Sequence, residues 1–264
     1  MKKLFRILAA ALLALFTTSC FEQTAVIRLN KDGSGTITET TLLSAEASGM
    51  LEAMAGGAKD PLAKMADKDS AAAYAKKIGE GVELEKAGKI TRGERTGVEV
   101  VYRFKDINTV KFTMGGSMAE TAKSMAPAGM AEKQPEQQPA SFKYADGVLT
   151  LVNPSNKPAE GEAAPQMPEV TDQQLAMAKG MFKDMKMGFT MEFPGGIEET
   201  NASHVEGNIV TMADIDFGKF VEDPAHLKKL MAANEQGPAA AAAAVKDIPG
   251  VKVETKEEFT VKLK

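Results

Sequence analysis

Apolar and polar side chains alternate along many short segments of this chain, a period of two that predicts strands with one buried face. The clearest of these segments are rich in β-branched residues, which pack well on a pleated surface. They span residues 36–41, 98–104, 148–152, 189–193 and 251–263, and the last is expected to form one long closing strand. Asp146-Gly147 separates two such segments and predicts a hairpin.

Helical periodicity occurs in separate, shorter groups. Residues 44–55 and 70–78 are predicted to be helices, and the strongest amphipathic pattern begins at Thr171. Short strands at 197–200 and 208–212 are expected to continue the sheet of residues 189–193. Runs of strands interleaved with separate groups of helices predict an α+β fold, with a largely antiparallel sheet built from hairpins and packed with several short helices.

Two segments differ in composition from the rest of the chain. Residues 114–140 hold few large apolar side chains except methionine, and residues 153–170 are rich in proline. Such compositions are typical of solvated linkers. The sequence therefore predicts a single α+β domain over residues 20–264, with flexible insertions near 114–140 and 153–170.

The first twenty residues have the order of a secretion signal. Lys2, Lys3 and Arg6 form a basic segment. It precedes a short apolar core, residues 7–16, which is too short to span a bilayer as a helix. The sequence TTSC that follows resembles the lipobox of bacterial lipoproteins, in which the cysteine becomes the first mature residue and carries the lipid. The resemblance implies a signal peptide over residues 1–19 and lipidation of Cys20 by acyl chains such as palmitate. The alternative is a buried free cysteine near an ordinary cleavage site.

A lipid on Cys20 would place the protein in the cell envelope, anchored to a bacterial membrane. Phe21 rather than an aspartate follows the cysteine. In a host with two membranes, the periplasmic face of the outer membrane is then the expected location.

NKDGSGTITETT, residues 30–41, has two possible interpretations. With Asn30 at position 1, Asp32 and Gly35 fall at positions 3 and 6 of an EF-hand loop, but Thr41 occupies position 12, where a bidentate carboxylate is needed. An EF-hand loop also joins two helices, whereas β-branched residues follow this one. A β-hairpin with glycines in its turn is the preferred interpretation, and no calcium binding is expected.

Catalytic and cofactor motifs are missing from the sequence. It contains no G-x-S-x-G, H-E-x-x-H or P-loop pattern, and His204 and His226 have no second ligand at metal-binding spacing. Removing Lys2, Lys3 and Arg6 with the signal peptide changes the formal net charge from −4 to −7. A net acidic chain with no basic block disfavours nucleic acid as a partner. We therefore expect no enzyme activity, no metal and no cofactor.

Three segments resemble bacterial lipoproteins with an LppM-type domain, and together they cover about a fifth of the chain. They are AVIRLNKDGSGTITET, VEVVYRFKDIN and MEFPGGIEETNASHVEGNIVTMADIDF. The resemblance implies a membrane-anchored, non-enzymatic module associated with lipid binding. This chain departs from such proteins by having no tryptophan and no C-terminal membrane helix, and by carrying the two long insertions.

The chain contains 16 methionines, several of them around the helix predicted at Thr171 and the strand after it. Methionine is flexible and is over-used on surfaces that adapt to apolar partners. One hypothesis is a groove for an apolar ligand; the alternative is ordinary core filling. The expected groove residues are Met181, Phe182, Met185, Phe189 and Met191. Two functions follow: a module that binds lipid or another apolar ligand, or a structural lipoprotein that docks a protein partner.

Overall fold

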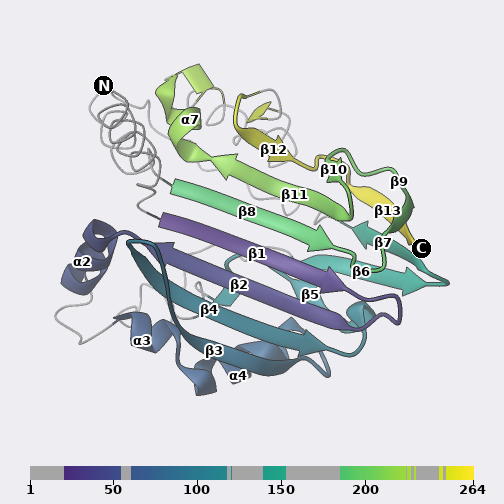
Figure 1. The fold of residues 1–264 in the computed structure, drawn as a ribbon, viewed down its shortest axis with the longest axis horizontal. Helices are drawn as coiled ribbons and strands as arrows, with labels where there is room; N and C mark the ends of the chain where they lie inside the picture. Colours follow the sequence, from purple (N-terminus) through teal and green to yellow (C-terminus); the bar gives the residue numbers. More distant parts are fainter. Residues whose placement is uncertain are drawn as a thin grey trace, which may run out of the picture.

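The computed structural model describes residues 21–54, 61–117, 120, 139–152, 185–223, 225–226, 229, 244–245 and 248–264. Its strands form an eight-stranded and a five-stranded sheet (Figure 1). The eight-stranded sheet has the order β10 (Val205–Glu206), β11 (Ile209–Asp216), β8 (Met185–Glu192), β1 (Phe21–Leu29), β2 (Gly35–Leu43), β4 (Arg95–Phe104) and β3 (Glu83–Arg92), and β12 (Val251–Val253) pairs with β11. The five-stranded sheet has the order β5 (Lys111–Phe112), β6 (Ala140–Ala145), β7 (Val148–Val152), β13 (Glu258–Leu263) and β9 (Ile197–Thr200).

The two sheets share one hydrophobic core. Each contributes one apolar face, and the rings of Phe112 on β5 and Phe189 on β8 meet with their centroids 5.1 Å apart. Burying two such faces against each other removes both from water, which is the main favourable term in folding. We call the core-facing side of the eight-stranded sheet its inner face.

The described helices are short and lie around the sheets. They are α2 (Ala45–Met54), α3 (Pro61–Met65), α4 (Lys68–Ile78), the 3-10 turn η2 (Ile107–Thr109) and α7 (Phe217–Glu222). The Asp67 carboxylate caps α4 by accepting a 2.8 Å hydrogen bond from the Ser70 backbone N–H. Figure 1 shows α3 and α4 beside β3. None of the helices in the described residues is both long and apolar enough to cross a bilayer.

The predicted α+β class is wrong. The described chain is mostly strand, arranged in two packed sheets, and its few helices lie around them. Segments with helical periodicity are expected to cover a sheet, but here the described helices lie around the sheets. Much of the inner face is instead covered by the second sheet, a pairing between segments far apart in sequence that no local pattern reports.

Residues 30–34 form the turn of a hairpin, as predicted. Strands β1 and β2 pair antiparallel on either side of it, so the flanks are not the helices of an EF-hand. Gly33 has φ of 85°, and a side chain at Gly35 would lie 1.9 Å from the carbonyl oxygen of Arg28. The predicted hairpin at Asp146-Gly147 is also confirmed, with both residues at positive φ between β6 and β7.

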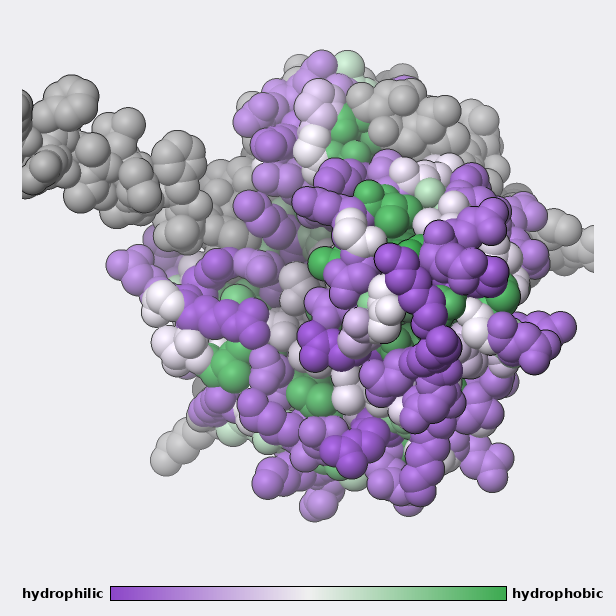
Figure 2. All heavy atoms as spheres, turned by 45° about the vertical axis from the view of Figure 1, so that its right-hand side comes forward, coloured by the Kyte–Doolittle hydropathy of each residue, from purple (hydrophilic) through white to green (hydrophobic). Residues whose placement is uncertain are grey.

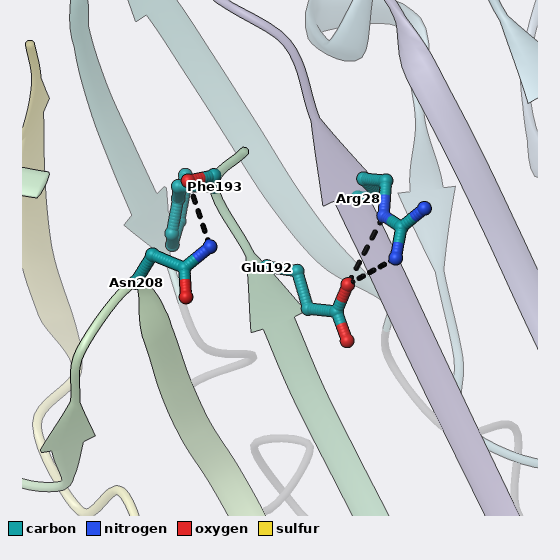
Figure 3. A network of polar contacts seen from close by, with 4 residues as sticks. All are labelled: Arg28, Glu192, Phe193 and Asn208. Carbon is teal, nitrogen blue, oxygen red and sulfur yellow. Dashed lines mark hydrogen bonds and ion pairs between the residues drawn. The ribbon is translucent and has the colours of Figure 1, made fainter. Parts of the chain in front are cut away.

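The pairing of β1 with β8 is parallel, and it connects residues more than 160 positions apart. At the end of this pair, Arg28 donates two hydrogen bonds to one carboxylate oxygen of Glu192, from Nε at 3.0 Å and from Nη2 at 2.6 Å (Figure 3). Just beyond, the Phe193 N–H donates to the Asn208 carbonyl at 2.9 Å, and the Asn208 amide donates back at 3.3 Å. These contacts lie where the β1–β8 pairing ends.

Two predictions about strand continuity are wrong. Residues 251–263 do not form one strand, since β12 belongs to the eight-stranded sheet and β13 to the five-stranded sheet. Residues 197–200, as β9, also join the five-stranded sheet rather than continuing that of β8. Both changes of sheet occur at short irregular segments, because a chain must bend to contribute to two packed layers.

Candidate functional site

Strand β2 places one carboxylate on the inner face of the eight-stranded sheet. Ile37, Glu39 and Thr41 share this face because side chains alternate along a strand. Glu39 lies opposite Ala25 on β1 and Val100 on β4, both buried apolar residues. A glutamate that is only 5 % exposed therefore stands in an apolar row of the sheet.

The Glu39 carboxyl is poorly satisfied. Among the described residues, no group meets hydrogen-bond geometry with either of its side-chain oxygens. Burial raises the pKa of Glu39 to about 7, while the Ser117 side chain and the Gly115 backbone approach closely enough to lower it by a smaller amount. Because the charged form is costly to bury, the carboxyl is mostly protonated below neutral pH and can then both donate and accept.

Two tyrosines lie close to Glu39. Tyr102 on β4 is fully buried, and its hydroxyl also has no hydrogen-bond partner within the described part of the chain. Tyr74 on α4 packs edge-on against it, with ring centroids 6.0 Å apart. Burial, followed by the nearby Glu39 carboxylate, raises the pKa of both phenols, so both remain protonated.

The backbone of segment 113–117 covers Glu39 and the polar side chains around it. Gly115 has φ of 73°, and a side chain on it would lie 2.8 Å from the Gln23 amide nitrogen. A side chain on Gly116 would lie 1.8 Å from the Tyr74 hydroxyl oxygen. Only glycine permits this close approach, so the two glycines seal the polar side chains against the sheet. We call Gln23, Glu39, Thr41, Tyr74 and Tyr102 the buried polar cluster.

The predicted groove residues fall into two groups. Met181 and Phe182, like the predicted lipidation site Cys20, lie outside the described residues. Met185, Phe189 and Met191 share the inner face of β8, where Met191 is fully buried, Phe189 is 8 % exposed and Met185 is half-buried. The prediction that Met185 belongs to the Thr171 helix is wrong, because β8 already begins at this residue. Whether these residues form a groove stays a prediction.

The structure joins the methionine-containing face to the buried polar cluster, which the sequence did not suggest. On β1, Gln23 lies between Thr41 of β2 and Met187 of β8, and Ala25 lies between Glu39 and Phe189. Apolar and polar side chains therefore lie side by side on one continuous face across β8, β1 and β2. This amphiphilic arrangement is the candidate site.

Sequence reasoning missed Glu39 because β2 carries threonine on both faces, which hides its buried side. A signal was present: the hairpin register pairs Glu39 with Ala25 in the apolar series Ala25, Ile27 and Leu29. That series belongs to the core, and its partner across the hairpin must share it.

The chemistry available at the site is hydrogen bonding rather than metal ligation. Within the described residues, no three His, Cys, Asp or Glu side chains are grouped so that they could hold a metal ion. The cluster offers one protonatable carboxyl, two phenols, an amide and a hydroxyl beside an apolar strand face. Such a set can orient the polar end of an otherwise apolar ligand.

Comparison with known proteins shows only weak structural likeness. The sequence matches no protein-family model and no curated protein. Among solved structures, the folded domain of the LppM protein of Mycobacterium tuberculosis, determined by NMR, is similar over 74 % of this chain and 82 % of that chain, at 12 % sequence identity and a TM-score of 0.31. This is a weak structural relationship.

Proposed function

We propose that this protein is a non-enzymatic lipoprotein of the bacterial cell envelope, anchored through Cys20, that binds a lipid or another apolar ligand along the inner face of β8. The observation that carries the proposal is that this face begins close to the predicted anchor. Strand β1 begins at Phe21, directly after Cys20, and Phe21 pairs with Met185 at the start of β8.

The short connection matters because it leaves no linker between anchor and sheet. With lipid on Cys20, the ends of β1 and β8 that carry Phe21, Met185 and Met187 face the bilayer. Figure 2 brings forward the side of the molecule that carries the opposite ends of these strands, and hydrophobic residues there form separate small patches among hydrophilic ones. The half-buried Met185 and Met187 at this end of β8 could receive a chain from the membrane, because unbranched side chains re-pack at low cost.

The anchor is tested by metabolic labelling with a clickable fatty acid. We expect the wild-type protein to be labelled and Cys20→Ala to be unlabelled. Equal labelling of the two would remove Cys20 as the anchor.

Ligand binding is tested with the chain from residue 21 onward, which contains every described element. The uncharged fluorophore N-phenyl-1-naphthylamine should bind, and Met185→Ala should weaken its binding several-fold through lost apolar contact. Met65→Ala on α3, also packed against the core, is the matched control and should not change the affinity. An absence of uptake by the folded wild-type chain would leave the alternative function, docking of a protein partner.

A further inference from the structure

The buried polar cluster has a feature that apolar-ligand binding alone does not explain. Glu39 is 5 % exposed and Tyr102 is fully buried, and the oxygens at the ends of both side chains lack a hydrogen-bond partner in the described residues. Buried polar groups are nearly always hydrogen-bonded, because an unmet one loses its interactions with water without replacement. Two such groups on neighbouring strands β2 and β4 indicate a shared function.

The cluster is also continuous with the methionine-containing face. Met187, Gln23 and Thr41 form one row across β8, β1 and β2, and Phe189, Ala25 and Glu39 form the next. Ala25, the residue between Phe189 and Glu39, has only a methyl group. An elongated molecule that enters beside the half-buried Met185 and Met187, and displaces the Phe189 ring from Phe112, would thus reach Glu39 past the smallest side chain in the row.

The segment that covers Glu39 belongs to neither sheet. It begins after β5 ends at Phe112, contains Gly115 and Gly116, and has a turn in which the Gly116 N–H donates to the Thr113 carbonyl at 3.0 Å. Just beyond it, Glu120 pairs with Lys77 of α4. Displacing the segment would therefore break no strand pair.

The chemistry of the cluster favours one kind of polar group. A carboxyl beside two phenols can accept hydrogen bonds from an ammonium or hydroxyl group, and a bond involving a charged partner is the stronger. A ligand carboxylate would instead bring a second negative charge next to an acidic group in a poorly solvated site, which is unfavourable.

We propose that Glu39 binds the hydrogen-bond-donating head group, amine or hydroxyl, of an amphiphile whose alkyl chain lies on the inner face of β8. This inference rests on the proposed function, because it requires that the β8 face take up an alkyl chain. It adds the class of head group and the residue that recognises it.

The test is competition among ligands that share a chain and differ in head group. The chain from residue 21 onward is loaded with N-phenyl-1-naphthylamine at pH 8, where Glu39, with a pKa of about 7, is mostly ionised, and dodecylamine, dodecanol and dodecanoate are compared as competitors. We expect dodecylamine and dodecanol to displace the fluorophore at concentrations about tenfold lower than dodecanoate, which corresponds to one charge-assisted hydrogen bond.

Two substitutions of Glu39 test whether this residue causes the preference for amine and hydroxyl head groups. Glu39→Leu removes every polar atom, and Glu39→Gln keeps the shape and an acceptor but not the charge. For Glu39→Leu, we expect the displacing concentrations of all three competitors to lie within about threefold of one another. For Glu39→Gln, we expect dodecylamine to lose its advantage over the other two. Glu99→Gln on β4, whose carboxylate pairs with Lys86 and Arg92 at the surface, is the control and should keep the wild-type order.

The outcomes separate this inference from the proposed function. If the fluorophore binds but the three competitors are equal in the wild type, or if the preference survives Glu39→Leu, the head-group assignment is wrong and apolar binding stands. If the fluorophore does not bind a chain whose cooperative thermal unfolding shows that it is folded, both proposals fail.

Discussion

Two glutamates, Glu39 and Glu254, are each 5 % exposed, yet their surroundings differ in nearly every other respect. Glu39 lies deep in the sheet without a hydrogen-bond partner in the described residues, and burial raises its pKa to about 7. Glu254 lies nearer the surface, between β12 and β13. Burial raises its pKa too, but hydrogen bonds from Ser203 and Lys256 outweigh that effect and lower the pKa overall.

Glu254 is a structural group. Its carboxylate accepts from the Ser203 N–H at 2.5 Å, from the Ser203 hydroxyl at 2.9 Å and from the Lys256 N–H at 3.1 Å. These bonds hold the bend at which the chain leaves one sheet for the other. The comparison shows that burial alone does not determine the charge of a carboxyl. Its pKa also depends on the hydrogen bonds that replace its contacts with water. A satisfied carboxylate stabilises the fold, whereas an unsatisfied buried one lowers its stability.

The largest effect is expected from Glu254→Ala. The substitution removes three hydrogen bonds to a charged acceptor and leaves two backbone N–H groups without it, so the free energy of unfolding should fall by about 4 kcal/mol. Urea denaturation measures this change. Glu258→Ala, at an exposed position at the start of β13, is the control and should change stability by less than about 0.5 kcal/mol. A loss below about 1 kcal/mol for Glu254→Ala would contradict the structural role.

The next effect concerns Glu39 and pH. Its pKa is about 7 in the folded state and 4.5 in the absence of the fold, so between these values the folded protein holds a proton that the unfolded chain has released. The contribution of Glu39 to stability should therefore decrease by about 3 kcal/mol as pH rises from 4.5 to 7, and change little above that range.

Glu39→Gln isolates this contribution. The difference in unfolding free energy between wild type and Glu39→Gln, measured by urea denaturation from pH 4 to 8, should fall by that amount across the range. The lowered pKa of Glu254 acts with the opposite sign, since its stabilisation is lost as pH falls below 4.5, and it cancels in the difference. A flat difference curve would show that the Glu39 carboxyl is satisfied in solution.

The smallest of the three effects concerns the segment that covers Glu39. Gly116→Ala places a methyl group 1.8 Å from the Tyr74 hydroxyl oxygen, which should cost about 2 kcal/mol of stability. Tyr74→Phe in the same chain removes that oxygen and should recover part of the loss, which a double-mutant cycle measures. Gly88→Ala on β3, where the added carbon meets nothing within 4 Å, is the control and should be nearly neutral. Equal thermal unfolding midpoints for Gly116→Ala and Gly88→Ala would contradict the close packing.

Much of the secondary structure was predictable because it depends on local sequence. The β1–β2 hairpin and the β6–β7 hairpin follow from period-2 segments joined by glycine-containing turns, and both are present. The order of the sheets was not predictable, because a strand pattern carries no information about its neighbours. Thus β8 pairs with β1 in parallel, and β9 leaves the sheet of β8 for the other one.

For the candidate site, the sequence determined that Phe189 and Met191 share one face, because side chains of a strand alternate. It predicted Met185 on the preceding helix, and only the structure showed that Met185 belongs to β8. The sequence also determined that Glu39 shares a face with Ile37 and Thr41. Only the tertiary structure decided that this face points into the core and that Tyr74 and Gly116 close over it. The physical reason is that alternation fixes which residues lie together, whereas their burial depends on a second layer brought from distant parts of the chain.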